Sequence, residues 1–167
     1  ALPILLNRKY FYEVLNEEFE KNKDSSLALA IINVDDFKLY NQLYGIKEGD
    51  VCLQHIAAII RSSVGDSGYI ARHGGKEFAV LLPKYDLFSA RNLVESIAKQ
   101  IFVMNNRRTD MKLKAVTVSA GISAAPYAAR TVKELMENVD LAVYHVKHSG
   151  KNGIQVFDTM FCNTNQQ

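Results

Sequence analysis

The segment "GYIARHGGKEFAVLLP", Gly68 to Pro83, predicts a β-hairpin. Two apolar runs flank the pair Gly74 and Gly75, and glycine pairs favour the tight turns that join antiparallel strands. We expect the second strand to run from Glu77 to Leu82, with Lys76 directly after the turn. Because a hairpin pairs its own two strands, part of the sheet is expected to be antiparallel.

The spacing of apolar residues elsewhere predicts helices and buried strands around this hairpin. Helices are expected over residues 6–22, 37–44, 50–61, 86–101 and 131–150, and strands over 25–34, 112–123 and 154–157. This order mixes antiparallel and crossover connections around one sheet. It predicts an α+β sandwich, in which a central, mostly antiparallel sheet of about five strands carries helices on both faces. We expect one domain over residues 1–158 and a flexible C-terminal tail over 159–167.

Composition narrows the class of protein. The chain has 167 residues, 48% hydrophobic and 23% charged, and its 20 basic and 18 acidic residues are interspersed. No nucleic-acid partner is expected from such a charge distribution. Cys52 and Cys162 lie far apart and are typical of free thiols in a reducing compartment. The longest apolar run, at residues 27–32, is far short of the ~20 residues of a membrane helix. We expect a cytoplasmic domain without membrane contact of its own, which could be the cytosolic part of a membrane-anchored sensor.

The segment "INVDDFKLYN", Ile32 to Asn41, is the first candidate site. A buried strand that ends in Asn33, Asp35 and Asp36 places oxygen ligands at the edge of the sheet, where divalent ions and phosphates commonly meet. The same residue types favour turns and helix caps. On this segment alone, a plain strand-to-helix turn is the favoured interpretation.

The segment "LYGIKEGD", Leu43 to Asp50, is the second candidate. Gly45 and Gly49 suit a loop with unusual dihedral angles, and Asp50 suits a helix N-cap. In a functional reading, Asn41 and Asp50 offer an amide and a carboxylate to a purine, since the N1–H and N2–H groups of guanine require an acceptor.

The segment "KHSGKN" places Lys147 and Lys151 four residues apart across a helix end. Cations are favoured there by the helix dipole alone. They could equally bind a triphosphate as point charges.

Four motifs in order resemble the GGDEF family, the diguanylate cyclase domains, over nearly the whole chain. They are "LPILLNRKYF" (residues 2–11), "NVDDFKLYNQLYGIKEGD" (33–50), "RHGGKEF" (72–78) and "VDLAVYHVKHSGKN" (139–152). The first is similar to L-T-G-L-x-N-R-R-x-F, with Pro3 and Ile4 in place of Thr and Gly. The third is similar to R-x-G-G-[D/E]-E-F and reads GGKEF here.

The resemblance implies a nucleotide-cyclase, ferredoxin-like palm that binds one GTP. Two such domains face each other as a dimer, and Mg²⁺ or Mn²⁺ ions help to join two GTP molecules into cyclic di-GMP. When the family's site residues are carried over to the matching positions, Asn41 and Asp50 would bind guanine. The backbone of Asp36, Phe37 and Lys38, together with Lys147 and Lys151, would bind the phosphates. The metal would be bound at the positions of Asn33, Val34 (carbonyl) and Lys76.

Two departures fall on the implied metal site. The family has carboxylates where this chain has Asn33 and Lys76. An amide oxygen is a weak neutral ligand, and an ammonium cannot bind a cation. At an effective dielectric of ~20, each unit of positive charge ~4 Å from Lys76 costs about 4 kcal/mol. We therefore predict weak or absent Mg²⁺ or Mn²⁺ binding and little or no cyclase activity, with Glu77 retained only as a residual catalytic residue.

The sequence leaves several functions open. Lys76 either neutralises the phosphates directly, in a GTP site without metal, or is a solvated lysine beside the turn. We predict a degenerate GGDEF domain that binds a guanine nucleotide and acts as a homodimer or with a partner signalling domain. The alternatives are a working cyclase that uses Asp35, Asp36 or Glu77 as substitute ligands, and a dimerisation or protein-interaction module without ligand. The family's product-binding motif, R-x-x-D, would fall at residues 65–68, where "GDSG" lacks both charges.

Overall fold

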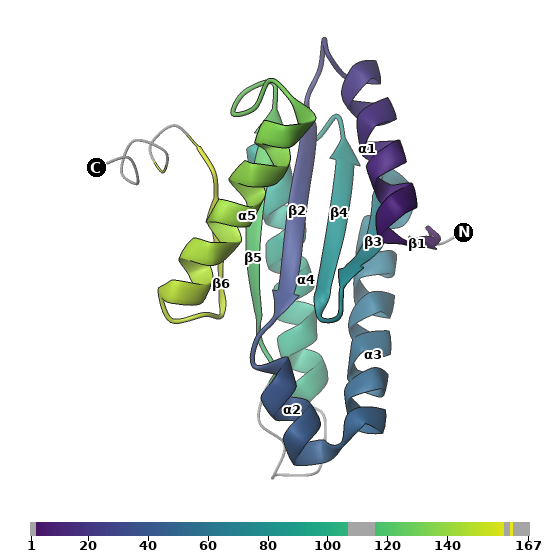
Figure 1. Cartoon of the computed structure of the whole chain (residues 1–167), viewed down its shortest axis with the longest axis vertical. Helices are drawn as coiled ribbons and strands as arrows, with labels where there is room; N and C mark the ends of the chain where they lie inside the picture. The colour runs from purple at the N-terminus through teal and green to yellow at the C-terminus, as the bar shows by residue number, and fades with distance from the viewer. Residues whose placement is uncertain (1–2, 107–115, 159–160, 162–167) are drawn as a thin grey trace.

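The computed structural model describes residues 3–106, 116–158 and 161 of the chain (Figure 1). The elements in chain order are β1 (Leu5–Leu6), α1 (Arg8–Lys21), β2 (Leu27–Val34), α2 (Phe37–Tyr44), α3 (Ile46–Val64), the 3₁₀ turn η1 (Gly65–Ser67), β3 (Tyr69–Gly74), β4 (Glu77–Pro83), α4 (Leu87–Asn106), β5 (Val118–Ala125), α5 (Val132–His148) and β6 (Gly153–Val156).

The strands form one mixed sheet in the order β1-β3-β4-β2-β5-β6. The outer pairs β1·β3 and β5·β6 are parallel, and the three inner pairs are antiparallel. The predicted α+β sandwich with a mostly antiparallel sheet is confirmed. The described part has six strands rather than about five. The additional strand is β1, whose residue Leu6 was expected to begin the first helix.

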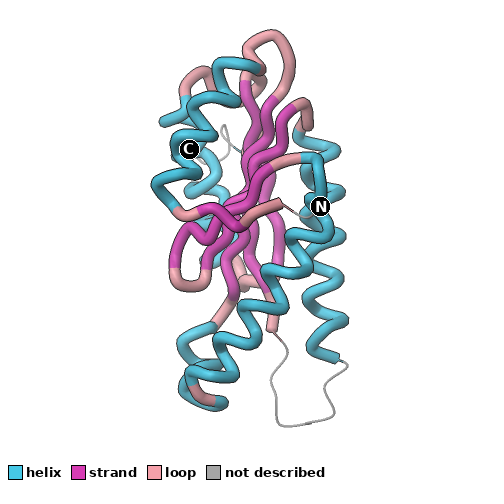
Figure 2. The backbone as a smooth tube through the Cα atoms, turned by 90° about the vertical axis from the view of Figure 1, so that its right-hand side faces the viewer, coloured by secondary structure: helices cyan, strands magenta, loops and turns pink. Residues whose placement is uncertain are grey.

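Helices cover both faces of the sheet, as Figure 2 shows with the sheet between two helical layers. Alternation along β2 divides the core in two. Ala28, Ala30 and Ile32 belong to the cluster that packs under α3 and α4. Leu27, Leu29 and Ile31 belong to the cluster under α1 and α5. The uninterrupted apolar run is therefore explained by burial on both faces.

The hairpin turn lies one residue later than predicted. Gly74 pairs with Glu77 in the sheet, so Gly75 and Lys76 form the two-residue turn. The register shifts between Arg72 and Gly74, and the Arg72 guanidinium donates to the carbonyl oxygens of both glycines. Lys76 is thus an exposed residue of the turn itself.

The predicted N-cap at Asp50 is wrong, because α3 begins four residues earlier at Ile46. Gly45, at φ 91°, donates its N–H to the carbonyl of Asn41 at 2.8 Å and so closes α2. It also directly precedes α3. One glycine in the left-handed region therefore ends one helix and starts the next, and Asp50 lies inside α3.

Two other predicted helix caps are confirmed. The carboxylate of Asp86 accepts from the N–H of Ser89 at 2.8 Å, just before α4. The hydroxyl of Thr131 accepts from the N–H of Glu134 at 3.1 Å, and the Glu134 carboxylate accepts from the N–H of Arg130 at 2.9 Å. None of the helices in the described part is both long and apolar enough to cross a membrane.

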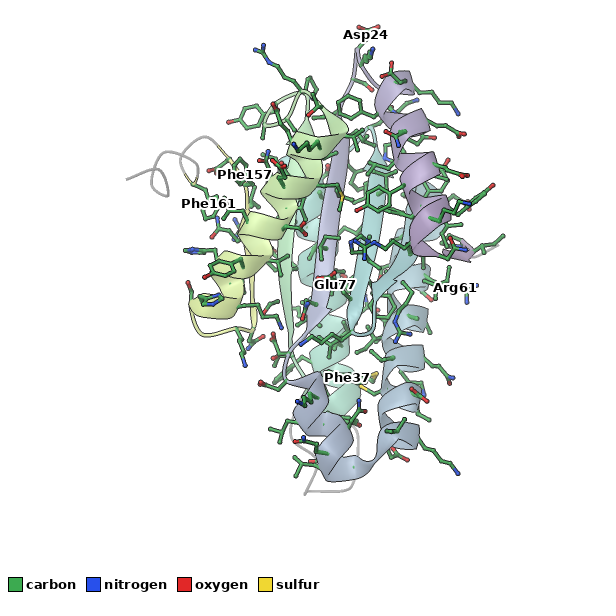
Figure 3. All side chains as sticks on the ribbon, in the orientation of Figure 1. Asp24, Phe37, Arg61, Glu77, Phe157 and Phe161 are labelled. Carbon is green, nitrogen blue, oxygen red and sulfur yellow. The ribbon has the colours of Figure 1, made fainter. Side chains whose placement is uncertain are left out.

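Two predictions near the C-terminus lie partly outside the described residues. The strand predicted over 112–123 is described only from residue 116 onward, and β5 begins there at Val118. Of the predicted tail, Phe161 is described, and it is 8% exposed. Its ring packs edge-on against Phe157, as Figure 3 shows at the side of α5. The domain boundary at residue 158 stays a prediction.

Candidate functional site

A hollow of about 430 Å³ lies where the N-terminus of α2, the β3–β4 turn and the end of α5 meet. It is called the lysine hollow below. Its lining residues are Asp36, Phe37, Lys38, Leu39, Gln42, Lys76, Lys147 and Lys151. Every residue for which the sequence predicted a phosphate-binding role is among them. That role itself stays a prediction, but the fold brings the four lysines to one place.

Asp35 ties β2 to α5 and β5 beneath this hollow. Its side chain accepts four hydrogen bonds: from Lys147 Nζ and Ser119 Oγ at 2.6 Å each, from Thr117 Oγ1 at 2.7 Å, and from the N–H of Asn152 at 3.0 Å. Asp35 is only 5% exposed, and this burial by itself would raise its pKa. The hydrogen bonds, led by that of Lys147, and the lysine charge outweigh burial and lower the pKa below its ordinary value. Asp35 is therefore an ionised carboxylate with both oxygens engaged.

Asp36 forms the second ion pair, with Lys151 Nζ 2.6 Å from its Oδ1. This pair is more open, since the side chains of Lys151 and Asp36 are 42% and 40% exposed. The hydrogen bond and negative charge of Asp36 raise the pKa of Lys151. Lys38 and Lys76 have no ion pair within the described residues. Two of the four lysine charges are thus balanced and two are not.

The residues at the implied metal positions do not fit a divalent ion. The Nδ2 of Asn33 donates to Glu77 Oε1 at 3.1 Å, and its Oδ1 is enclosed, without a hydrogen-bond partner in the described part of the chain. The reverse orientation of the amide would set two oxygens against each other, so Nδ2 is the atom that faces Glu77. Among the described residues, no group of three or more His, Cys, Asp or Glu side chains is placed to hold a metal.

The backbone holds the turn against the end of β2. The N–H of Val34 donates to the carbonyl of Lys76 at 2.9 Å. Figure 3 shows Glu77 on the stretch of sheet between α1 and α5. The turn therefore presents an ammonium at the lysine hollow, while the carboxylate of Glu77 is bonded to Asn33.

The predicted guanine-binding residues lie together where α2 meets α3. A Cβ atom at Gly49 would lie 1.7 Å from Asn41 Oδ1 and 3.1 Å from the ring of Phe37, so a side chain at this position would displace the Asn41 amide. Asp50 follows Gly49 and is exposed. Gln42, next to Asn41, lines the lysine hollow. Asn41 therefore lies on the same helix as the predicted phosphate positions Phe37 and Lys38, whereas Asp50 lies on α3.

Several residues of the site have no role predicted from the sequence. Leu39 and Gln42 line the lysine hollow, and Thr117 and Ser119 bind Asp35. A signal existed for the two hydroxyls, because they alternate with apolar residues at the start of β5. Their role depends on β5 lying next to β2, which a local pattern does not reveal.

Comparison with known proteins places these features in a family. The chain is 30% identical over 152 residues to Diguanylate cyclase A of Treponema denticola, covering 88% of this chain and 41% of that protein. It is 35% identical over 169 residues to the bifunctional diguanylate cyclase/cyclic di-GMP phosphodiesterase MucR of Pseudomonas aeruginosa, covering 99% and 24%. The chain therefore spans less than half the length of either relative.

A solved structure agrees with the fold. The GGDEF domain of DgcB from Caulobacter crescentus, determined in complex with c-di-GMP, superposes with a TM-score of 0.83 at 26% identity and covers 93% of each chain. The family model described as "Diguanylate cyclase, GGDEF domain" matches residues 1–153. The resemblance of the four motifs is confirmed by this match, and the chain belongs to the GGDEF family of diguanylate cyclase domains.

Proposed function

We propose that this chain is a degenerate GGDEF domain that binds GTP or a related guanine nucleotide and synthesises little or no cyclic di-GMP. The observation that carries the proposal is the position of Lys76. It lines the same hollow as Lys147 and Lys151, at the turn where the family has a metal-binding carboxylate. The site thus keeps its cations for phosphate and lacks two anions for a metal ion.

The loss of the metal ligands bears directly on catalysis. In phosphoryl-group transfer, divalent ions offset the charge that develops on the phosphate oxygens. Here Asn33 offers an enclosed amide oxygen, and Lys76 offers no ligand at all. Lys76 is exposed, so water screens part of its repulsion of a cation, but no amount of screening turns an ammonium into a ligand.

The alternative of a working cyclase requires substitute ligands, and each candidate is already engaged. Asp35 accepts four hydrogen bonds, Asp36 is paired with Lys151, and Glu77 accepts from Asn33. The direct test is to incubate the protein with GTP and Mg²⁺ or Mn²⁺ and to separate the products by chromatography. The proposal predicts unchanged GTP, and steady accumulation of cyclic di-GMP would favour the working cyclase.

Calorimetric titration distinguishes a binding domain from a ligand-free interaction module. We expect GTP to bind more tightly than ATP, because Asn41 and Asp50 offer groups complementary to guanine. Asn41→Ala should remove this preference, whereas Asn16→Ala, an exposed asparagine on α1, should leave it unchanged. Failure of GTP to bind below millimolar concentration, with or without chelator, would leave only the interaction module.

The assembly is part of the same proposal. We expect a homodimer, or pairing with another signalling domain of the parent chain, in the cytoplasm where the buried thiol of Cys52 stays reduced. Sedimentation velocity with and without GTP tests this. A monomer at every concentration in both conditions would argue against the homodimer.

A further inference from the structure

The disagreement between the lysine hollow and a divalent ion suggests how the site selects its ligand. Building on the nucleotide binding proposed above, we infer that the lysine hollow takes a polyphosphate group free of metal, and that Mg²⁺ antagonises this binding. In a site where the metal bridges protein and phosphate, Mg²⁺ strengthens the binding of the phosphate. Here we expect Mg²⁺ to weaken it. The ligand class is therefore a free nucleoside polyphosphate rather than its magnesium complex.

The charge of the hollow is the first argument. Lys147 and Lys151 are each 2.6 Å from a carboxylate oxygen, whereas Lys38 and Lys76 have no ion pair within the described part of the chain. Two positive charges therefore remain for an incoming anion. Magnesium removes two negative charges from a polyphosphate, and so weakens the attraction that these lysines supply.

The geometry of Lys76 is the second argument. The hydrogen bond from the N–H of Val34 to the Lys76 carbonyl pins the turn at the end of β2, so the side chain rises from a fixed point at the hollow. An ammonium is a compact charge with three donors and can bind phosphate oxygens directly. It therefore takes over the neutralising role of an ion at this position, and an ion there would compete with it.

The two ion pairs differ in how readily they open. The side chains of Asp35 and Lys147 are 2% and 19% exposed, and that pair is held by further hydrogen bonds. The side chains of Asp36 and Lys151 are 40% and 42% exposed, and such exposed ion pairs contribute little to stability. An entering phosphate can thus draw Lys151 away from Asp36 while Lys147 stays in place. Lys38, Lys76 and Lys151 are the lysines that can respond to the ligand.

The test uses inorganic tripolyphosphate alongside GTP, since tripolyphosphate reports on the phosphate half of the site without guanine. Both are titrated calorimetrically into the protein at constant ionic strength, once with EDTA and once with excess Mg²⁺. We expect both to bind in EDTA and to bind about tenfold or more weakly in Mg²⁺, tenfold being the step that one lost charged contact commonly makes.

Single substitutions test which lysine causes the difference in binding between EDTA and Mg²⁺. Lys76→Gln should weaken metal-free binding about tenfold and reduce the difference between EDTA and Mg²⁺. Lys133→Gln is the matched control, because Lys133 lies at the start of α5 with its side chain 85% exposed and paired with Glu137. It should change neither value.

The outcomes separate this inference from the function on which it rests. Tighter binding of GTP in Mg²⁺, or equal binding of tripolyphosphate in both conditions, would overturn the inference and leave nucleotide binding intact. Absence of binding by GTP and tripolyphosphate in both conditions would overturn the proposed function as well. An unchanged affinity in Lys76→Gln would overturn the role given to that lysine.

Discussion

Replacing Asp35 by asparagine should destabilise the domain much more than the same replacement at its neighbour Asp36. Each carboxylate accepts from a lysine Nζ at 2.6 Å, so the two pairs are matched in distance. They differ in burial. The side chain of Asp35 is 2% exposed and that of Asp36 is 40% exposed.

The size of the effect at Asp35 follows from its partners. Asparagine keeps the shape of the side chain, but it removes the charge and turns an amide N–H₂ toward groups that donate. Breaking a buried ion pair by removing one partner costs about 3–5 kcal/mol. Because Lys147 keeps 19% exposure and the Thr117 hydroxyl can rotate to accept, we expect the lower end, about 3 kcal/mol. For a domain of this size that lowers Tm by roughly 6–12 °C.

The pH dependence gives a second signature. The pKa of Asp35 is lowered in the folded state, so its contribution to stability is complete above the ordinary value of 3.8 and is lost as the pH falls from there to the folded-state pKa. The variant has no such group to protonate. The difference in stability between wild type and Asp35→Asn should therefore shrink as the pH falls below 3.8.

The assay is urea denaturation followed by far-ultraviolet circular dichroism, since the chain has no tryptophan. Asp36→Asn is the control, and asparagine tolerates the left-handed backbone at this position, where φ is 53°. We expect its midpoint to stay near that of wild type, because water screens the pair. Equal losses in the two variants, or no loss at Asp35, would refute the argument from burial.

Two further predictions concern the metal and guanine positions. The double variant Asn33→Asp/Lys76→Glu should bind Mn²⁺ in the presence of GTP, seen as loss of the free-ion signal in electron paramagnetic resonance, because two carboxylates return to the site. A signal identical to that of wild type would argue against those positions. Gly49→Ala should weaken GTP binding in calorimetry, because its methyl would displace the Asn41 side chain. Its unfolding midpoint should change little, because the higher helix propensity of alanine, up to about 1 kcal/mol, offsets the cost of moving the Asn41 side chain. An unchanged GTP affinity would contradict a role for Asn41.

Much of the fold could be predicted because its signals are local. The apolar run at residues 27–32 needs burial on both faces, and it forms the centre of β2. The short helix of residues 37–44 ends where Gly45 interrupts it, and Thr131 caps α5 through its own side chain. Each of these features depends on neighbours within a few residues, which a sequence pattern records.

The features that were missed depend on distant partners. β1 is only two residues long and exists because Leu5 and Leu6 pair with Ile70 and Ala71 of β3. The hairpin turn is set by the pairing of Gly74 with Glu77 rather than by the glycine pair. Alternation within a two-residue strand, or the register of a sheet, is not visible in a local window.

In the candidate site, too, local features were predicted and contacts between distant residues were missed. The motifs indicated the lysines and the guanine positions, and the fold places the lysines around one hollow. The sequence did not indicate that Lys147 pairs with Asp35, 112 residues away, or that Lys151 pairs with Asp36, 115 residues away. These pairs decide which lysine charges remain for a ligand.

The proposed function depends most on one point: Asn33 and Lys76 do not form a binding site for a divalent ion. The most direct measurement is an anomalous difference map from crystals grown with GTP and Mn²⁺. With GTP in excess over Mn²⁺, so that metal-free nucleotide is present, we predict nucleotide phosphate in the lysine hollow and no manganese within bonding distance of Asn33 Oδ1 or the Val34 carbonyl oxygen. A manganese peak bonded to those two atoms, with the nucleotide phosphates above it, would contradict the account.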